Sequence, residues 1–185
     1  MAIAYSKIEI NIEEILLRDK PQAMLDTSPK GTVPVLILNN GEVIDESRDI
    51  MIWALAQGDE QSWYYGLTSQ QQSLINKLID TFDEQFKPIL DKYKYSSRSP
   101  DLSEDELRNK ALPYLNQLND LLGKNHYLIS QQLTLADMAI FPFIRQFCFV
   151  NKQWFDSSPY ANLQAWLTKH LESALFQAVM SKAKD

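Results

Sequence analysis

The chain has 185 residues, of which 45% are apolar, and this is enough to bury a core in one large domain or two small ones. Its 24 acidic and 18 basic residues give a net charge of −6, which disfavours non-specific binding to nucleic acid or to an anionic membrane. A single cysteine, Cys148, excludes an internal disulfide framework, and two isolated histidines give no support for a metal site.

The sequence carries no apolar run approaching the roughly 20 residues that span a bilayer. Residues 1–7 lack the basic start, apolar stretch and small-residue cleavage site of a signal peptide. Together with the single cysteine, which suits a reducing compartment, these features predict a cytoplasmic protein with no membrane and no nucleic-acid partner.

The first 57 residues predict a small α/β unit. Apolar and polar residues alternate in 8–13, which is the period of a half-buried strand, and Asn39-Asn40-Gly41 is typical of a tight hairpin turn. In chain order we expect the end of a helix at 1–7, a strand at 8–13, a short helix from Asp19 to about Thr27, strands at 33–38 and 42–44, and a helix to about Gln57.

Residues 58–69, rich in Gly, Ser, Gln and Tyr, predict a linker, and 70–185 predict an all-helical domain. The first long helix has an apolar series at every fourth position and a kink at Pro88, and a break follows at 96–100. A capping box at Ser103-Glu106 starts the next helix, which runs to Gly123. Further helices are expected at 134–150 and 162–183. The apolar series consists of Leu74, Leu78, Phe82, Phe86 and Leu90.

Three motifs together resemble one known family. They are the segment 28–38, which contains Val33-Pro34, the pair Glu46-Ser47 before a helix, and Thr134-Leu-Ala-Asp137 before an apolar helix. This combination is similar to the glutathione transferase family, in its omega and related bacterial branch. The resemblance implies an α+β, mainly α fold, in which a thioredoxin-like α/β half (1–57) precedes an all-α C-terminal domain (70–185).

The resemblance begins late in the family pattern. Residues 1–7 match the end of the family's first helix, and Ile8 begins its second strand, so the first strand and most of the first helix are missing. The family's sulfur-contacting Ser, Tyr or Cys lies in that part, and we therefore assign no catalytic residue. The missing strand lies between the second and third strands of the family's sheet. A shortened sequence, closure of the strands over the gap, or another chain in the gap would each account for this.

Val33-Pro34 has two interpretations. A proline at the start of a strand is tolerated there for local reasons alone. Alternatively the bond is cis, and the backbone of Val33 pairs with an extended peptide. The family resemblance favours the second interpretation, since a cis-proline in thioredoxin-like folds holds the cysteinyl backbone of glutathione. We expect this bond to face the start of the helix near Glu46.

Glu46-Ser47 can likewise be a simple helix start, because both residue types are favoured there. A helix N-terminus also offers free N–H groups to an anion. The resemblance implies that Ser47 donates to the γ-glutamyl carboxylate of glutathione and that Glu46 accepts from its ammonium group. By the same resemblance Lys20 reaches the glycyl carboxylate, with a solvated surface lysine as the alternative. Lys30 is a weaker candidate for that role.

Two other residues are interpreted as structural. Thr134 and Asp137 are expected to cap the helix that follows them. Cys148 lies on the same apolar helix without a close basic neighbour and is interpreted as an inert core thiol.

The function implied by the resemblance is glutathione binding, with conjugation or thiol transfer in the full-length family, and glutathione acts as the co-substrate. An unidentified hydrophobic or electrophilic small molecule is the expected second substrate. A homodimer is expected, with apolar surface supplied by the segment 53–65. The alternatives are a non-catalytic binding or regulatory protein on the same scaffold and a chance likeness in an unrelated α/β protein. Without a donor at the sulfur we expect these 185 residues to conjugate no faster than the reaction in solution.

Overall fold

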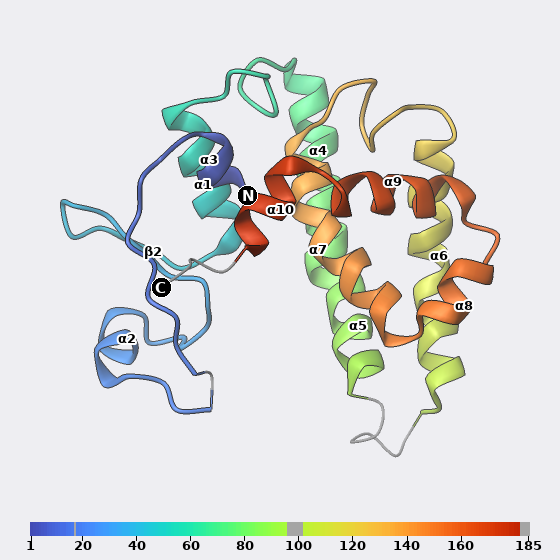
Figure 1. The fold of residues 1–185 in the computed structure, drawn as a ribbon, viewed down its shortest axis with the longest axis horizontal. Coiled ribbons are helices and arrows are strands. Elements are labelled where there is room, and N and C mark those ends of the chain that lie inside the picture. Colours follow the sequence, from blue (N-terminus) through green and yellow to red (C-terminus); the bar gives the residue numbers. More distant parts are fainter. Residues whose placement is uncertain (17, 96–101, 182–185) are drawn as a thin grey trace. The chain divides into compact units, whose positions relative to one another are not determined.

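The computed structural model describes residues 1–16, 18–95 and 102–181. The chain consists of two compact units, an N-terminal unit, Met1–Gln61, and a C-terminal unit, Ser62–Asp185 (Figure 1). The predicted break at 96–100 lies outside the described residues. Within the described parts of the chain, no helix is long and apolar enough to cross a membrane.

The N-terminal unit contains short helices and one hairpin. Its strands pair antiparallel, with Leu36 opposite Ile44 and Ile37 opposite Val43. Gly41 at the turn has φ +87°, a conformation that glycine adopts at no steric cost. The elements are α1 (Ala2–Tyr5), α2 (Gln22–Thr27), β1 (Leu36–Ile37), β2 (Val43–Ile44) and α3 (Ser47–Gln57).

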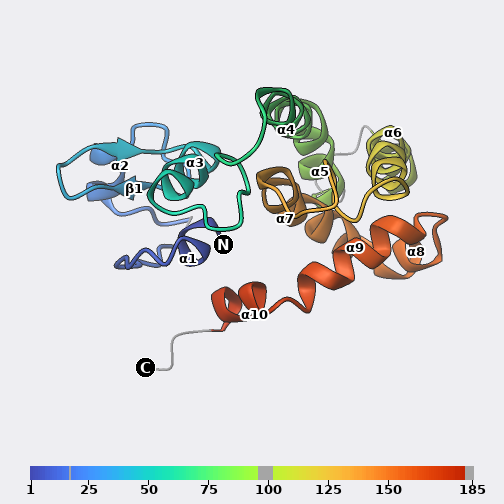
Figure 2. The same cartoon turned by 90° about the horizontal axis from the view of Figure 1, so that it is seen from above.

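Helices α1 and α3 pack together and form most of this unit's core. Ala2 contributes from α1, and Ile50, Ala54 and Leu55 contribute from α3. The Ser6 hydroxyl donates to the Gly58 carbonyl over 2.8 Å, which fixes the end of α3 against α1. Figure 2 shows α1, α2, α3 and β1 of this unit from a second direction.

The strand predicted at 8–13 is wrong. These residues form no strand in the structure, and their side chains are mostly exposed. The predicted strand at 33–38 is shortened to Leu36–Ile37, and the one at 42–44 to Val43–Ile44. Alternation of apolar and polar residues describes which side chains could be buried together, but a strand also needs a neighbouring strand for its N–H and C=O groups. For residues 8–13 the described residues provide none.

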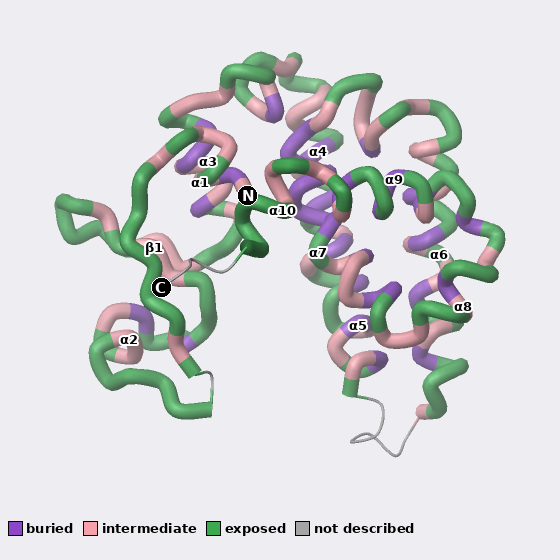
Figure 3. Tube along the Cα trace, viewed as in Figure 1, coloured by how far each residue is buried: buried purple, intermediate pink, exposed green. Residues whose placement is uncertain are grey.

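The regular elements in the described parts of the C-terminal unit are all helices. Most of its buried residues lie on α4, α5, α6, α7 and α9, where the tube of Figure 3 is purple. The elements are α4 (Ser69–Thr81), the π-helical turn η1 (Phe82–Phe86), α5 (Lys87–Lys94), α6 (Glu104–Leu122), α7 (Leu135–Val150), α8 (Lys152–Ser157), α9 (Ala161–Leu171) and α10 (Ala174–Met180).

The first long helix changes its geometry before Pro88. The π-helical turn η1 separates α4 from α5, and Pro88 lies in the first turn of α5. Proline donates no N–H and crowds the preceding turn, so a local widening of the helix accommodates it. The sequence predicted a kink at Pro88, and the structure places a π-helical turn immediately before it.

The predicted apolar face of this helix is wrong at one position. Leu74 is 50% exposed, whereas its neighbour Ile75 is fully buried. A step of four residues overshoots one helical turn by about 40°, so a series with four-residue spacing rotates off the core. The π-helical turn changes the register, and Phe86 and Leu90 are buried after it.

Capping residues fix several helix ends. Ser103 and Glu106 form the predicted capping box of α6, with the Ser103 N–H donating to the Glu106 carboxylate over 2.8 Å. The predicted box of Thr134 and Asp137 at α7 is also confirmed. Gly123 follows α6 at the predicted position.

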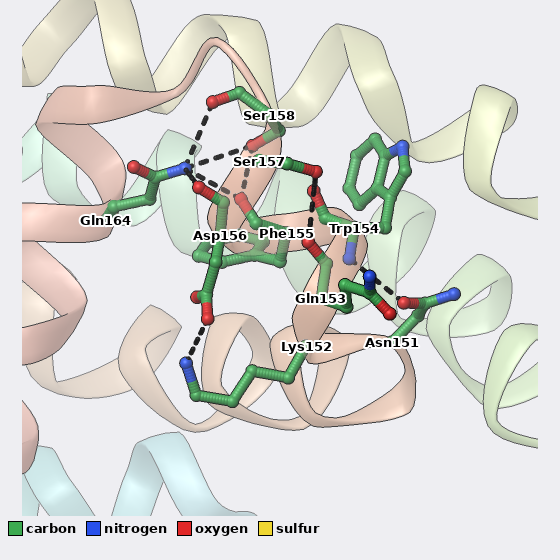
Figure 4. A network of polar contacts seen from close by, with 9 residues as sticks. All are labelled: Asn151, Lys152, Gln153, Trp154, Phe155, Asp156, Ser157, Ser158 and Gln164. Carbon is green, nitrogen blue, oxygen red and sulfur yellow. Dashed lines mark hydrogen bonds and ion pairs between the residues drawn. The ribbon is translucent and has the colours of Figure 1, made fainter.

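A polar network holds α8 against the start of α9 (Figure 4). The Asn151 side chain accepts from the Trp154 N–H over 3.0 Å and so caps α8. The Gln164 amide donates to the carbonyls of Phe155, at 2.7 Å, and Ser158, at 3.1 Å. The Phe155 carbonyl also accepts from the Ser158 N–H over 3.2 Å, so these bonds add to the pairing at the end of the short helix.

Candidate functional site

The predicted site residues all lie in the N-terminal unit, and two of them begin α3. Glu46 is the N-cap residue, with extended backbone angles, and Ser47 is the first residue of the helix. Both are exposed. The first N–H groups of a helix have no partner within it and point their positive potential outward. The start of α3 is therefore suited to hold a carboxylate.

A tight turn at residues 28–31 is hydrogen-bonded to the residues at the start of α3. The buried Ser28 hydroxyl donates to Asp45 over 3.2 Å. The Lys30 ammonium donates to Asp45 over 3.2 Å and to Glu46 over 2.7 Å. Gly31 closes the turn with φ +60°, and its N–H donates to the Ser28 carbonyl over 2.9 Å. The two acids therefore share one ammonium group.

The electrostatics of this cluster favour its charged forms. The pKa of Lys30 is raised, chiefly by its hydrogen bond to Glu46 and then by that to Asp45. The pKa of Asp45 is lowered by the bond from Lys30, with help from Ser28. Both effects show that an ammonium group is favoured between these carboxylates.

Lys20 lies beside the same turn. Its side chain is exposed, and its Nζ is 3.6 Å from the point where a Cβ on residue 31 would lie. Such a Cβ would also come within 3.1 Å of Leu25, and the positive φ disfavours any side chain there. Glycine at position 31 thus keeps the turn and the Lys20 side chain close together.

Val33 and Pro34 follow the turn directly. The bond between them is cis, which confirms the sequence-based prediction. Val33 is 46% exposed, and Pro34 is also exposed. Both line a cavity of about 690 Å³ in the N-terminal unit, together with residues 10–15.

The sequence did not indicate Ser28 and Asp45 as members of this cluster, and it suggested a different partner for Lys30. Lys30 was a weaker candidate for the glycyl carboxylate, but in the structure it pairs with Asp45 and Glu46. The segment Ser-Pro-Lys-Gly at 28–31 is a recognisable turn. Its attachment to residues 45 and 46 depends on the fold, since these residues are distant in sequence.

The remaining reactive groups do not add to this site. Cys148 is buried in the C-terminal unit, and its burial raises the pKa of the thiol. Among the described residues, no group of three or more His, Cys, Asp or Glu side chains is arranged to hold a metal ion.

Two family models match the chain. Residues 1–62 match the glutathione S-transferase N-terminal domain, and residues 103–169 match the glutathione S-transferase C-terminal domain. A curated relative, glutathione S-transferase stcT of Emericella nidulans, is 23% identical over 163 residues, which cover 82% of this chain and 70% of that protein. The chain spans between 63% and 70% of the lengths of three curated relatives that it matches.

Solved structures show the same fold. The ternary complex of BphK, a bacterial GST, superposes with a TM-score of 0.82 at 20% identity, covering 97% of this chain and 90% of that one. A glutathione S-transferase from Methylobacillus flagellatus, with glutathione bound, gives a TM-score of 0.79 at 20% identity, covering 96% and 89%.

The two domain models match the two successive units, and the superpositions cover nearly the whole chain. The chain belongs to the glutathione S-transferase family.

Proposed function

We propose that this protein binds glutathione at the start of α3, as members of its family do when they conjugate the glutathione thiol to an electrophilic small molecule. The observation that carries this proposal is the cluster of Asp45, Glu46 and Ser47. Two carboxylates there already hold an ammonium group, next to a helix N-terminus that can hold a carboxylate. An α-amino acid end, such as the γ-glutamyl end of glutathione, carries both groups together.

Each proposed residue then has one role. Glu46 accepts hydrogen bonds from the ligand's ammonium, and Ser47 donates to its α-carboxylate. The backbone of Val33, positioned by Pro34, pairs with the cysteinyl part, while Lys20 reaches the glycyl carboxylate. Because Lys30 holds Asp45 and Glu46 in the free protein, the ligand's ammonium has to share or displace it.

Ser47 offers a direct test with a matched control. Ser47 is the first residue of α3, and Ser69 is the first residue of α4 in the C-terminal unit. We expect Ser47→Ala to weaken glutathione binding at least about fivefold, since it removes one bond to a charged group. Ser69→Ala should leave the affinity unchanged. Isothermal titration calorimetry measures both.

The dipeptide Cys-Gly sharpens this test because it lacks the γ-glutamyl end. If Ser47 binds the γ-glutamyl carboxylate, Ser47→Ala has no effect on the weak binding of Cys-Gly. An equal loss for both ligands would mean that the variant alters the unit as a whole. Equal glutathione affinity of the wild type and Ser47→Ala would contradict the proposed role.

The proposed residues bind the two ends and the middle backbone of glutathione. None of them is proposed to contact its sulfur. The expectation that these 185 residues conjugate at the rate of the solution reaction stays a prediction. Its measurement is the consumption of a chromogenic aryl halide with and without the protein. The relatives are transferases by name, so the comparisons do not favour a non-catalytic scaffold. A rate well above background that Ser47→Ala abolishes would contradict the prediction.

We further propose a glutathione-binding domain at 1–57, a linker at 58–69 and a helical domain at 70–185, in a cytoplasmic homodimer. The dimer proposal rests mainly on family membership. The segment 53–65 supports it less, because its Trp63 is buried, although its Tyr65 is 49% exposed. Sedimentation at micromolar concentration measures the oligomeric state, and a monomer would contradict the dimer.

A further inference from the structure

The free protein holds an ammonium group of its own at the residue proposed to bind the ligand's ammonium. The Lys30 Nζ lies 2.7 Å from a carboxylate oxygen of Glu46 and 3.2 Å from one of Asp45. Glu46 is the residue that we propose to accept from the α-ammonium of glutathione. Lys30 and the ligand therefore bring the same functional group to the same acceptor.

The two carboxylates differ in how firmly the fold holds them. The Asp45 side chain is 28% exposed and accepts a second hydrogen bond, from the buried Ser28 hydroxyl. The Glu46 side chain is 59% exposed and makes no capping bond to α3, and among the described residues Lys30 is its one hydrogen-bond donor. Glu46 is therefore the carboxylate that can change its partner, whereas Asp45 is held in place by the turn.

The charges of this cluster leave room for one more ammonium group. Two carboxylates share the single positive charge of Lys30, so one negative charge in the cluster is not balanced. A ligand's ammonium would balance it. Ion pairs between exposed side chains contribute little to stability, so the bond between Lys30 and Glu46 can be exchanged at small cost.

We propose that Lys30 is a specificity-determining residue that occupies the ammonium position of the free site. When the ligand binds, its ammonium takes Glu46 and Lys30 stays on Asp45. By neutralising part of the charge of the two carboxylates, Lys30 limits how strongly the site prefers ligands that carry an α-ammonium. This inference rests on the proposed glutathione site and adds to it the residue that sets the ligand's charge.

Two ligands and three variants test this role. Glutaryl-Cys-Gly differs from glutathione only in lacking the α-ammonium, so the ratio of the two affinities measures the preference for that group. Lys30→Met should raise this ratio at least about fivefold, because both carboxylates remain and the competing ammonium is gone. Lys30→Arg keeps the charge and should give the wild-type ratio. Isothermal titration calorimetry measures the affinities, and circular dichroism verifies the fold of each variant.

Lys7 is the matched control. It lies in the same unit, is exposed, and pairs with Glu60, which follows the opposite end of α3. Lys7→Met removes the same charge from the protein and should leave the ratio unchanged. The effect of Lys30→Met should also be smaller at high salt than at low salt, because the cluster is exposed to solvent.

The wild-type protein gives a second readout that needs no variant. Limited acetylation followed by mass spectrometry measures the reactivity of Lys30 relative to Lys7, with and without S-methylglutathione. Loss of the bond to Glu46 and the arrival of a second ammonium both favour the neutral amine, which is the reactive form. We therefore expect saturating ligand to speed the relative acetylation of Lys30 at least about twofold.

The inference and the proposed function fail in different ways. If Ser47→Ala weakens glutathione binding but Lys30→Met leaves the ratio of affinities unchanged, the site stands and the role of Lys30 is wrong. Slower acetylation of Lys30 in the presence of the ligand would also overturn that role, because the ligand would then only cover the side chain. Absence of glutathione binding by the wild type would overturn the proposed function, and this inference with it.

Discussion

The two units of this protein reach stability in different ways. Among the described residues, the buried apolar side chains of the N-terminal unit are Ala2, Ile50, Ala54 and Leu55, and all others lie in the C-terminal unit. The C-terminal unit also buries a network of aromatic rings. The ring centroid of Phe147 lies 4.9 Å from that of Tyr93 and 5.8 Å from that of Phe86. The N-terminal unit instead exposes branched side chains such as Ile12 and carries the polar cluster at the start of α3. Most of the buried apolar core thus lies in the C-terminal unit, whereas the residues that we propose to bind glutathione lie in the N-terminal unit.

Hydrogen exchange should show the largest contrast between the units. Amides of α7, whose residues are largely buried, should exchange only on global unfolding, with opening free energies of about 5 kcal/mol or more. Amides of residues 8–15, which are mostly exposed and form no helix or strand, should exchange with opening free energies near zero. Exchange followed by NMR or mass spectrometry measures both. Equal protection in the two segments would contradict the contrast.

Asp137 should be the most sensitive single residue of the C-terminal core. It is fully buried and accepts four hydrogen bonds, from the Leu128 N–H, the Trp166 indole, and the Thr134 N–H and hydroxyl. Asp137→Ala leaves these donors unpaired, and we expect the free energy of unfolding to fall by about 4 kcal/mol. Urea denaturation measures the change.

Asp105 supplies the control for this prediction. It is an exposed acid in the first turn of α6 and pairs with Arg108. Asp105→Ala should change the free energy of unfolding by about 0.5 kcal/mol or less. A loss of less than about 1 kcal/mol in Asp137→Ala would contradict the role of Asp137 as an organising core acceptor.

His170 should make the C-terminal unit sensitive to acid. It is buried against Trp166 and Phe141, its Nε2 has no hydrogen-bond partner among the residues that the structure describes, and burial lowers its pKa from 6.5 to about 4. Between these pH values the unfolded chain binds a proton that the folded chain excludes. Stability is therefore fully present above pH 6.5 and falls by about 3 kcal/mol as the pH is lowered to about 4.

The pH dependence is isolated by substitution. His170→Phe should remove this fall in the free energy of unfolding at acid pH. His126→Gln, at an exposed position, should show the same fall as the wild type. Unfolding followed by tryptophan fluorescence at pH 7, 5.5 and 4 gives the comparison. The same acid loss in His170→Phe and the wild type would contradict this assignment.

The smallest expected effect compares two neighbouring residues of α4. Ile75 is fully buried and Leu74 is 50% exposed. We expect Ile75→Ala to cost about 2 to 3 kcal/mol and Leu74→Ala about 0.5 kcal/mol. Thermal or urea unfolding measures both. A larger loss for Leu74→Ala than for Ile75→Ala would contradict this comparison and would support the apolar face predicted from the sequence.

Several features followed from the sequence because their causes are local. The capping box of Ser103 and Glu106 involves groups a few residues apart, so their types and spacing are sufficient. The hairpin turn at 39–41 and the start of α3 at Glu46-Ser47 were predicted for the same reason. The candidate site residues came from the family resemblance, and their roles stay predictions.

Other features were decided by tertiary structure. Residues 8–13 have the alternation of a strand, but a strand forms only where a neighbour pairs with its backbone, and pattern alone does not supply one. The exposure of Leu74 depends on the helical register before η1. The pairing of Lys30 with Asp45 and Glu46 joins groups 15 and 16 residues apart through the fold. The sequence by itself determined the local starts and turns, and only the tertiary structure decided which distant groups satisfy one another, because such contacts depend on chain positions that no local pattern encodes.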